Sequence, residues 1–285
     1  MEYNKISGFS DEISADIKEQ FQELNKLGIC YFEPRGIDGT NISKLTEEEM
    51  FALKALMDEH GICASSIGSP IGKIKVSADF EAHMEVMKNV VKAANILGTK
   101  YIRVFSFYHE KNTEWTEEER AEVFRRIRVM IDYAQKEDVI LLHENEKDIY
   151  GDTAERCLEL MQEFAGPNFK VIFDPANFVQ CQEDTMRAYQ MLRPYIEYMH
   201  IKDAMSCDES VVPAGYGDGN VKWILQNLFQ TGFNGFLSLE PHLGNFKGFA
   251  DLEIEAAKKV IPAVYGGPQA FKLAYESLLK ILENI

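Results

Sequence analysis

Eight short apolar runs are spread along the chain, and segments with helical hydrophobic spacing separate them. Several runs are apolar at consecutive positions, as expected for parallel strands that are covered on both faces. Eight strand–helix units in 285 residues, with no linker rich in Pro, Gly or Ser, favour one closed (β/α)8 barrel. A doubly wound open sheet is the alternative, although such a sheet rarely needs eight evenly spaced units. The runs are Ile6–Phe9, Cys30–Glu33, Ile62–Ile67, Tyr101–Phe105, Val139–Leu142, Val171–Phe173, Ile196–Ile201 and Phe236–Leu239.

The segments between the runs carry the start and stop signals of α-helices. Thr46 opens a capping box with the glutamate three residues later, which satisfies the first free amides of a helix. Gly28 and Gly61 stand just ahead of the second and third runs, where a glycine commonly ends a helix. We therefore expect an α/β protein with a single (β/α)8 TIM barrel over residues 1–285, closed by a C-terminal helix at about 269–285.

The charge balance limits the partners that this chain can have. With 30 basic and 46 acidic residues, the formal net charge is −16. Such a surface repels phosphate backbones and anionic lipids, so we expect neither nucleic-acid binding nor docking on a membrane. The sequence has no apolar run of transmembrane length and no signal-peptide pattern at its start. Its five cysteines form no Cys-x-x-Cys pair, so we expect reduced cysteines in a cytoplasmic protein.

Four successive strands in the second half end on a carboxylate or an imidazole. Glu144, Asp174, His200 and Glu240 occupy these ends, where the chemistry of such barrels lies. One inward side chain per strand can converge on the barrel axis, and three carboxylates packed that closely repel one another without a cation. Three oxygen donors and an imidazole predict one divalent metal ion, with Mn²⁺, Co²⁺ or Mg²⁺ favoured and Zn²⁺ also compatible. A lone strand-end carboxylate is usually a helix cap or a solvated loop residue, so the prediction depends on all four.

These strand ends resemble those of the xylose isomerase-like barrel superfamily, specifically its sugar phosphate isomerase/epimerase branch. The likeness covers essentially the whole chain. By resemblance, Glu144, Asp174, His200 and Glu240 take the metal-ligand positions, and in the ketose 3-epimerases the two glutamates also serve as acid and base. The most specific motifs are His143-Glu144-Asn145, Phe173-Asp174-Pro175, His200-Ile201-Lys202-Asp203 and Leu239-Glu240-Pro241-His242.

The resemblance implies a chemistry for the two glutamates. A hydrogen beside a ketone is too weakly acidic for a carboxylate alone to remove, and a metal that chelates the ketone and the neighbouring hydroxyl stabilises the enediolate that forms. Glu144 and Glu240 could then stand on opposite faces of the carbon, one removing the proton and the other returning it. We expect a metal-dependent isomerase or epimerase of a sugar or sugar phosphate.

Other polar residues near the strand ends are candidates for substrate binding. Lys202 lies two residues beyond His200 and could hold a substrate oxygen or pair with a neighbouring acid. Arg103 lies inside an apolar strand and needs an acidic partner or a substrate contact if it is buried. The candidates are Lys73, Arg103, Glu146, Asn177, Lys202 and His242, while Glu33 and Arg35 are expected to be solvated loop charges or to contact hydroxyls or a phosphate.

Three other functions are weighed against this one. An inosose-type dehydratase starts from the same enolate, and many sugar-acting relatives carry His at the positions of Glu146 and Asn177, so the substrate class stays open. A catalytically silent sugar-binding barrel is the alternative of another class, although binding alone would not require both glutamates at a metal. The abasic-site endonucleases of the superfamily need His at position 177 and Asp-x-His at 218–220, which the sequence lacks. The expected partner is a small-molecule sugar or sugar phosphate, with a homo-oligomer compatible with the family.

The loop Gly215–Gly219 is rich in glycine but does not match a phosphate-binding motif. We expect a flexible loop there, and a candidate lid over the substrate.

Overall fold

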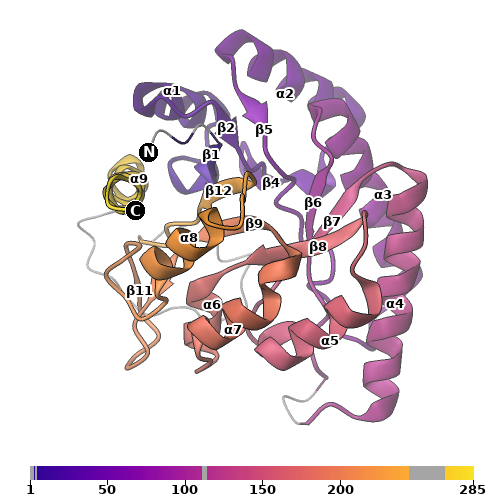
Figure 1. Ribbon diagram of the computed structural model, residues 1–285. Coiled ribbons are helices and arrows are strands. Elements are labelled where there is room, and N and C mark those ends of the chain that lie inside the picture. The colour runs from indigo at the N-terminus through magenta and orange to yellow at the C-terminus, as the bar shows by residue number, and fades with distance from the viewer. Residues whose placement is uncertain (1–2, 4, 111–113, 244–266) are drawn as a thin grey trace.

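The computed structural model describes residue 3 and residues 5–110, 114–243 and 267–285. Figure 1 shows helices arranged around parallel strands, as the alternating pattern predicts. The barrel strands are β1 (Ile6–Gly8), β2 (Tyr31–Phe32), β5 (Cys63–Ala64), β6 (Tyr101–Val104), β7 (Ile140–Glu144), β8 (Phe169–Phe173), β9 (Ile196–Ile201) and β12 (Phe236–Leu239).

The strands lie side by side in chain order, and the ring closes between the last and the first. Six form one parallel sheet in the order β1-β12-β9-β8-β7-β6, and β2 pairs in parallel with β5. Directly after β2, the amide of Glu33 donates to the carbonyl of Gly8 at 2.9 Å. Beyond β5, Ile67 forms a parallel bridge to Ile102 of β6. These links join the two groups of strands into the predicted TIM barrel.

The third strand is shorter than the expected Ile62–Ile67. Its regular pairing covers only β5, because the chain touches β6 at the single position Ile67. Two short antiparallel pairs, too short to give the sequence a periodic pattern, lie in the loops. They are β3 (Gly36–Ile37) with β4 (Thr40–Asn41), and β10 (Asp203–Ala204) with β11 (Val211–Val212).

The helices begin and end where the capping residues predict. The hydroxyl of Thr46 accepts from the amide of Glu49, and the Glu49 carboxylate accepts from the amide of Thr46. Gly28 and Gly61 adopt φ values of 73° and 67° at the helix ends, a conformation that glycine tolerates best. The helices are α1 (Ile17–Leu27), α2 (Glu47–His60), α3 (Phe80–Leu97), α4 (Glu117–Lys136), α5 (Ala154–Phe164), α6 (Pro175–Gln180), α7 (Thr185–Leu192), α8 (Val221–Phe229) and α9 (Pro268–Glu283).

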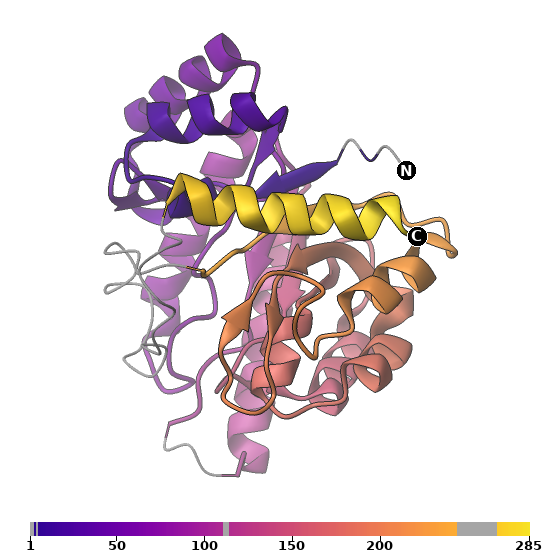
Figure 2. The same cartoon turned by 90° about the vertical axis from the view of Figure 1, so that its left-hand side faces the viewer.

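The last helix, α9, lies between α1 and α8 in the ring of Figure 1 and runs lengthwise across one side of the barrel in Figure 2. It packs on β12 and on the short 3₁₀ helix Ser10–Glu12 that follows β1. Helix α9 also lies close to β1, because a Cβ added at Gly8 of β1 would lie only 2.6 Å from Cζ of Phe271 in α9. No helix among the described residues is long and apolar enough to cross a membrane.

The barrel interior is apolar towards its amino-terminal end and polar towards its carboxyl-terminal end. Leu142, Ile172 and Tyr198 form a buried cluster inside the ring. Because side chains alternate along a strand, the residue two positions later on each of these strands also points inward. Those residues are Glu144, Asp174 and His200. The two-residue period of the strands therefore places these polar side chains next to one another, directly above the apolar cluster.

Candidate metal centre and active site

The four predicted metal ligands lie together at the carboxyl-terminal end of the barrel. Glu144 is the last residue of β7 and His200 lies in β9, whereas Asp174 and Glu240 directly follow β8 and β12. One potential ligand atom of each residue lies within 4.8 Å of those of the other three, and all four residues are buried. The structure thus brings together side chains from four neighbouring strands of the ring.

The imidazole of His200 turns one nitrogen towards the three carboxylates. Its Nδ1 lies 3.0 Å from Glu144 Oε1, 3.6 Å from Glu240 Oε2 and 3.9 Å from Asp174 Oδ2. Its Nε2 lies on the other side of the ring, 3.3 Å from Glu33 Oε2. The nitrogen that faces the cluster is therefore Nδ1.

Asp174 is fixed by the start of α6. Its Oδ1 accepts from the backbone amide of Asn177 at 2.9 Å, so the residue caps the helix as well as facing the site. Its backbone amide and carbonyl both bond to the side chain of Asn145. The amide group of Asn177 donates to Glu144 Oε1 at 3.2 Å. Asn177 therefore supports two of the predicted ligands.

Two predicted substrate-binding cations contact the carboxylates directly. Lys202 Nζ lies 3.0 Å from Asp174 Oδ2 and 2.9 Å from Glu240 Oε2. Arg103 Nη1 lies 3.2 Å from Glu144 Oε2 and 3.7 Å from Glu240 Oε1. Arg103 is buried and has the acidic partners that its place in an apolar strand requires.

Residues that follow the first two strands of the barrel contact Glu240 or its neighbours. The guanidinium of Arg35 bonds to both carboxylate oxygens of Asp11 at 2.8 and 3.0 Å, and to Glu12 and Glu240 at 3.3 Å each. His242 Nε2 lies 3.4 Å from Glu240 Oε1 and 3.5 Å from Glu12 Oε1. The expectation of a solvated Arg35 is wrong, because the loop after β2 folds its side chain onto the buried carboxylates.

Lys73 and Glu146, also predicted to bind substrate, pair with each other. Their charged atoms are 3.0 Å apart, and both side chains are partly exposed. The ammonium of Lys73 also lies 4.4 Å from the centre of the Phe105 ring. Burial would lower the pKa of Lys73, but the charge of Glu146 outweighs it and the pKa is raised. This pair is more exposed than Lys202 and Arg103, which places it towards the solvent side of the site.

The electrostatics of the ligands follow from burial opposed by neighbouring charges. Burial favours the neutral form of Glu144, but His200 and Arg103 outweigh it and lower its pKa to about 2. For Asp174 burial dominates the attraction of Lys202, and the pKa rises to about 6. For His200 the charges of Glu144 and Glu33 outweigh burial and raise the pKa to about 10. Cationic neighbours therefore favour the ionised form of Glu144, and the surrounding carboxylates favour the protonated form of His200.

The residues fit a divalent cation. A cation about 2 Å from each ligand atom needs those atoms within about 4 Å of one another, and the potential ligand atoms of this cluster lie within 4.8 Å. Asp174 Oδ2 is buried and, within the described residues, has no hydrogen-bond partner besides its ion pair with Lys202. Each carboxylate oxygen has lone pairs for more than one cation. Three carboxylates with one imidazole suit Mn²⁺, Co²⁺, Mg²⁺ or Zn²⁺.

The glycine-rich loop wraps around an internal carboxylate. Asp203 accepts from the backbone amides of Ala204, Gly215, Gly217 and Gly219 at 2.8 to 3.1 Å. A Cβ at Gly217 or Gly219 would lie 2.5 or 2.6 Å from Asp203 Oδ1, so side chains would prevent this close approach. The amides that a phosphate-binding loop would offer to a ligand are used here by Asp203.

Some of the site residues escaped sequence reasoning. Asp11, Glu12 and Asn145 were not predicted, and Glu33 was expected in solvent but is buried within the barrel. The signal that could have found them is the same strand-end rule. Asp11 and Glu12 come three and four residues after the end of β1, and Glu33 stands two residues after Tyr31, which packs on Phe236 in the barrel.

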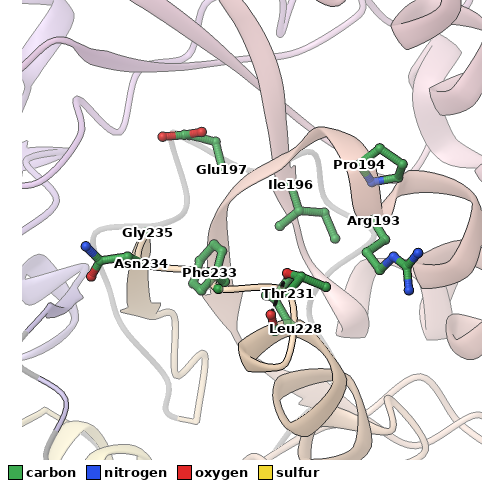
Figure 3. Close-up of a pocket in the computed structure, with 10 residues that line it drawn as sticks. Arg193, Pro194, Ile196, Glu197, Leu228, Thr231, Phe233, Asn234 and Gly235 are labelled. Atoms are coloured by element: carbon green, nitrogen blue, oxygen red, sulfur yellow. Dashed lines mark hydrogen bonds between the residues drawn. The ribbon is translucent and has the colours of Figure 1, made fainter.

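A separate cavity of about 550 Å³ lies at the opposite end of the barrel. Figure 3 shows Ile196, Leu228 and Phe233 on its wall, with Arg193 and Glu197 beside them. The lining residues lie at and just before the start of β9, at the end of α8 and in the loop that leads into β12. The cavity therefore contains none of the predicted site residues.

Comparison with known proteins agrees with this geometry. Residues 21–261 match the family model described as xylose isomerase-like TIM barrel. The chain belongs to this family. The predicted family and fold are therefore confirmed.

Proteins that are similar to this chain carry different names. A curated relative from Bacillus anthracis, 3-dehydroshikimate dehydratase, is 30% identical over 135 residues, which are 47% of this chain and 48% of that protein. The match thus spans about half the length of this relative. A solved structure of a D-tagatose 3-epimerase-like protein has a TM-score of 0.75 and 16% identity, covering 98% of this chain and 97% of its own. The structure of IOLI protein with a bound zinc atom has a TM-score of 0.72 and 18% identity, covering 98% of both chains.

Proposed function

We propose that this protein is a divalent-metal-dependent isomerase or epimerase of a sugar or sugar phosphate. The observation that carries the proposal is the convergence of Glu144, Asp174, His200 and Glu240 at one end of the barrel. Two of these ligands are glutamates from strands that are separated in the ring by β8 and β9. Such a pair can approach a substrate carbon from two sides.

The metal, when bound, would act as a Lewis acid that increases the acidity of the hydrogen beside a ketone. Glu144 and Glu240 are both kept ionised by cationic neighbours, so either can accept that proton. The first glutamate takes the proton from carbon and later releases it to water. The second glutamate takes up a proton from water and delivers it to the other face of the carbon or to the neighbouring carbon. In the latter case the hydroxyl proton of the substrate moves to the former ketone oxygen. Lys202 and Arg103 lie against these carboxylates and would hold the substrate oxygens on which negative charge develops.

The polar groups beyond the ligands suit a small polyhydroxylated substrate. Lys73 and Glu146 offer one donor and one acceptor at the partly exposed side of the site. His242 lies next to Glu240 and can contact the same substrate oxygens. Asn177 holds Glu144 and Asp174 in place from α6. We assign the ion to Mn²⁺, Co²⁺ or Mg²⁺ first, and a zinc-bound structural neighbour keeps Zn²⁺ among the candidates.

A dehydratase is the second candidate, and the 30% identity to 3-dehydroshikimate dehydratase favours it. The reaction would begin with the same proton removal beside a carbonyl. The intermediate would then expel a hydroxyl from the next carbon, and the second acid would protonate that hydroxyl so that it leaves as water. The two activities therefore share their first step and diverge at the second.

The test is solvent deuterium incorporation, detected by mass spectrometry and NMR, in ketoses, ketose phosphates, an inosose and 3-dehydroshikimate with Mn²⁺ or Co²⁺. We expect labelling by the natural chain and a loss of about 10²- to 10⁴-fold in Glu240→Gln. Glu197→Gln is the matched control, because its carboxylate bonds to Tyr101 near the other end of β9. Bound metal is measured in each variant so that a lost ion is not mistaken for a lost base.

Each outcome separates the candidates. Labelling at one carbon with inversion or carbonyl migration supports the epimerase or isomerase, whereas loss of water supports the dehydratase. Equal labelling by the natural chain and metal-loaded Glu240→Gln would contradict the role of Glu240. Tight metal binding with no exchange in any substrate would favour a silent binding protein.

A further inference from the structure

A carboxylate from β2 lies underneath the candidate metal centre. Glu33 directly follows β2, and its side chain is fully buried inside the barrel. Its backbone amide is part of the link between β2 and Gly8. A buried carboxylate is costly unless donors or a cation compensate it. The groups that contact Glu33 therefore indicate the role of this carboxylate.

Three donors meet at one oxygen of this carboxylate. Glu33 Oε2 lies 2.8 Å from the hydroxyl of Tyr198, 2.8 Å from the hydroxyl of Ser238 and 3.3 Å from Nε2 of His200. The other oxygen, Oε1, has no hydrogen-bond partner in the described part of the chain. The contacts thus aim Oε2 at the imidazole.

The hydroxyls beneath Glu33 hold this arrangement in place. Tyr198 also lies 2.9 Å from the hydroxyl of Ser65, which in turn lies 2.6 Å from that of Ser7. This chain of hydroxyls crosses the barrel from β9 to β1. Among the residues that the structure describes, His200 is the one ion-pair partner of Glu33 within 4 Å.

The two nitrogens of His200 face opposite partners. With Nε2 turned to Glu33, Nδ1 points at Glu144 at 3.0 Å and towards the other two ligand carboxylates. A cation that binds at Nδ1 displaces the proton there, and Oε2 of Glu33 is placed to accept the hydrogen that stays on Nε2. A histidine ligand whose other nitrogen donates to a carboxylate is held in one tautomer and one ring orientation.

We propose that Glu33 is a positioning residue for the metal ligand His200. This inference rests on the proposed metal-dependent function. Glu33 does not touch the cation or the substrate, and it acts by presenting Nδ1 of His200 to the cation. Removing such a partner typically weakens metal affinity by about 10- to 100-fold.

The experiment is calorimetric titration of the metal-stripped full chain with Mn²⁺. Glu33→Met removes the acceptor at similar length, and its dissociation constant should rise by about 10- to 100-fold. Glu33→Gln keeps an oxygen that can accept from His200, so it should recover most of the affinity. Glu197→Met is the control, since it removes a partly buried carboxylate from the far end of β9, where it accepts from Tyr101. Its Mn²⁺ affinity should stay that of the natural chain.

A structural role would give a different pattern. It would lower the thermal midpoint of the metal-free protein and leave Mn²⁺ affinity within about threefold of the Glu197→Met control, which would overturn the inference. If Glu33→Met does not fold, Glu33→Asp withdraws the carboxylate by one methylene and should also weaken Mn²⁺ binding. A natural chain that binds no divalent metal would refute the proposed function itself, whereas normal binding in both Glu33→Met and the control would refute only the role of Glu33.

Discussion

Replacing Asp203 by Asn tests whether this carboxylate holds the loop after β9 in place. Oδ1 accepts from the amides of Ala204 and Gly219, and Oδ2 from those of Gly215 and Gly217. An Asn side chain keeps one oxygen and replaces the other by an NH₂ group, which is itself a donor. Two of the four amides would then face a donor and lose their bonds.

The expected cost follows from those two bonds. A hydrogen bond to a charged group is worth about 1.5–3 kcal/mol, so losing two costs the loop about 3–6 kcal/mol. These amides exchange with solvent when the loop opens locally, and each 1.4 kcal/mol lost raises the population of the open state about tenfold. The exchange rates of the Gly215, Gly217 and Gly219 amides should therefore rise by at least about 100-fold in Asp203→Asn. Hydrogen exchange with mass spectrometry on peptides covering residues 204–220 measures this directly.

A neighbouring carboxylate supplies the matched control. Asp218 lies in the same loop and is exposed, and it accepts from the amide and the hydroxyl of Ser206 at 2.7 Å each. Exposed polar contacts of this kind contribute little to stability. Asp218→Asn should therefore raise the amide exchange rates of Gly215, Gly217 and Gly219 far less than Asp203→Asn does. If Asp203→Asn left the exchange of the three glycines unchanged, or matched Asp218→Asn, the loop would not depend on the buried carboxylate.

Two further predictions concern stability. His83 accepts from the amide of Gly72 at 2.8 Å, and burial lowers the pKa of His83 from 6.5 to about 4. The unfolded chain therefore takes up a proton at higher pH than the folded one, so stability should fall by up to about 3 kcal/mol as the pH drops from about 6.5 to 4. Urea unfolding of His83→Leu should lack this part of the pH dependence, and an unchanged slope would exclude His83 as its source. Gly8→Ala should cost about 1–3 kcal/mol in urea unfolding because its Cβ would collide with Phe271, whereas Gly166→Ala, with its nearest neighbour 3.7 Å away, should be nearly neutral. Equal midpoints would show that α9 can move aside at no cost.

The barrel and the cluster of four ligands were accessible from the sequence because both depend on regular periods. Consecutive apolar positions identify buried strands, and a two-residue period predicts that His200 in β9 and Lys202 just beyond it point the same way. The structure brings these residues together with Glu144, Asp174 and Glu240. Their roles in binding and catalysis stay predictions.

The contacts among loops were not accessible in the same way. Arg35 reaches Asp11 and Glu240 across long sequence separations, and no local pattern encodes which acid a flexible guanidinium selects. The glycines that predict a flexible loop also let backbone amides approach Asp203, and the flexibility itself stays a prediction. The spacing of Gly215, Gly217 and Gly219 is explained only by the position of the Asp203 carboxylate, which the sequence does not give.

The closure of the barrel also has a consequence for synthesis of the chain. Ile6 pairs with Leu237, so one edge of β1 waits for its partner while roughly 230 further residues are added. At about 5–20 residues per second, this interval is roughly 10–50 s, far longer than local helix formation needs. During that time the nascent chain carries an unpaired strand edge, which is a template for association with other chains. The ring can therefore close only after β12 has been synthesised, and until then the edge of β1 is open to a chaperone or to another chain.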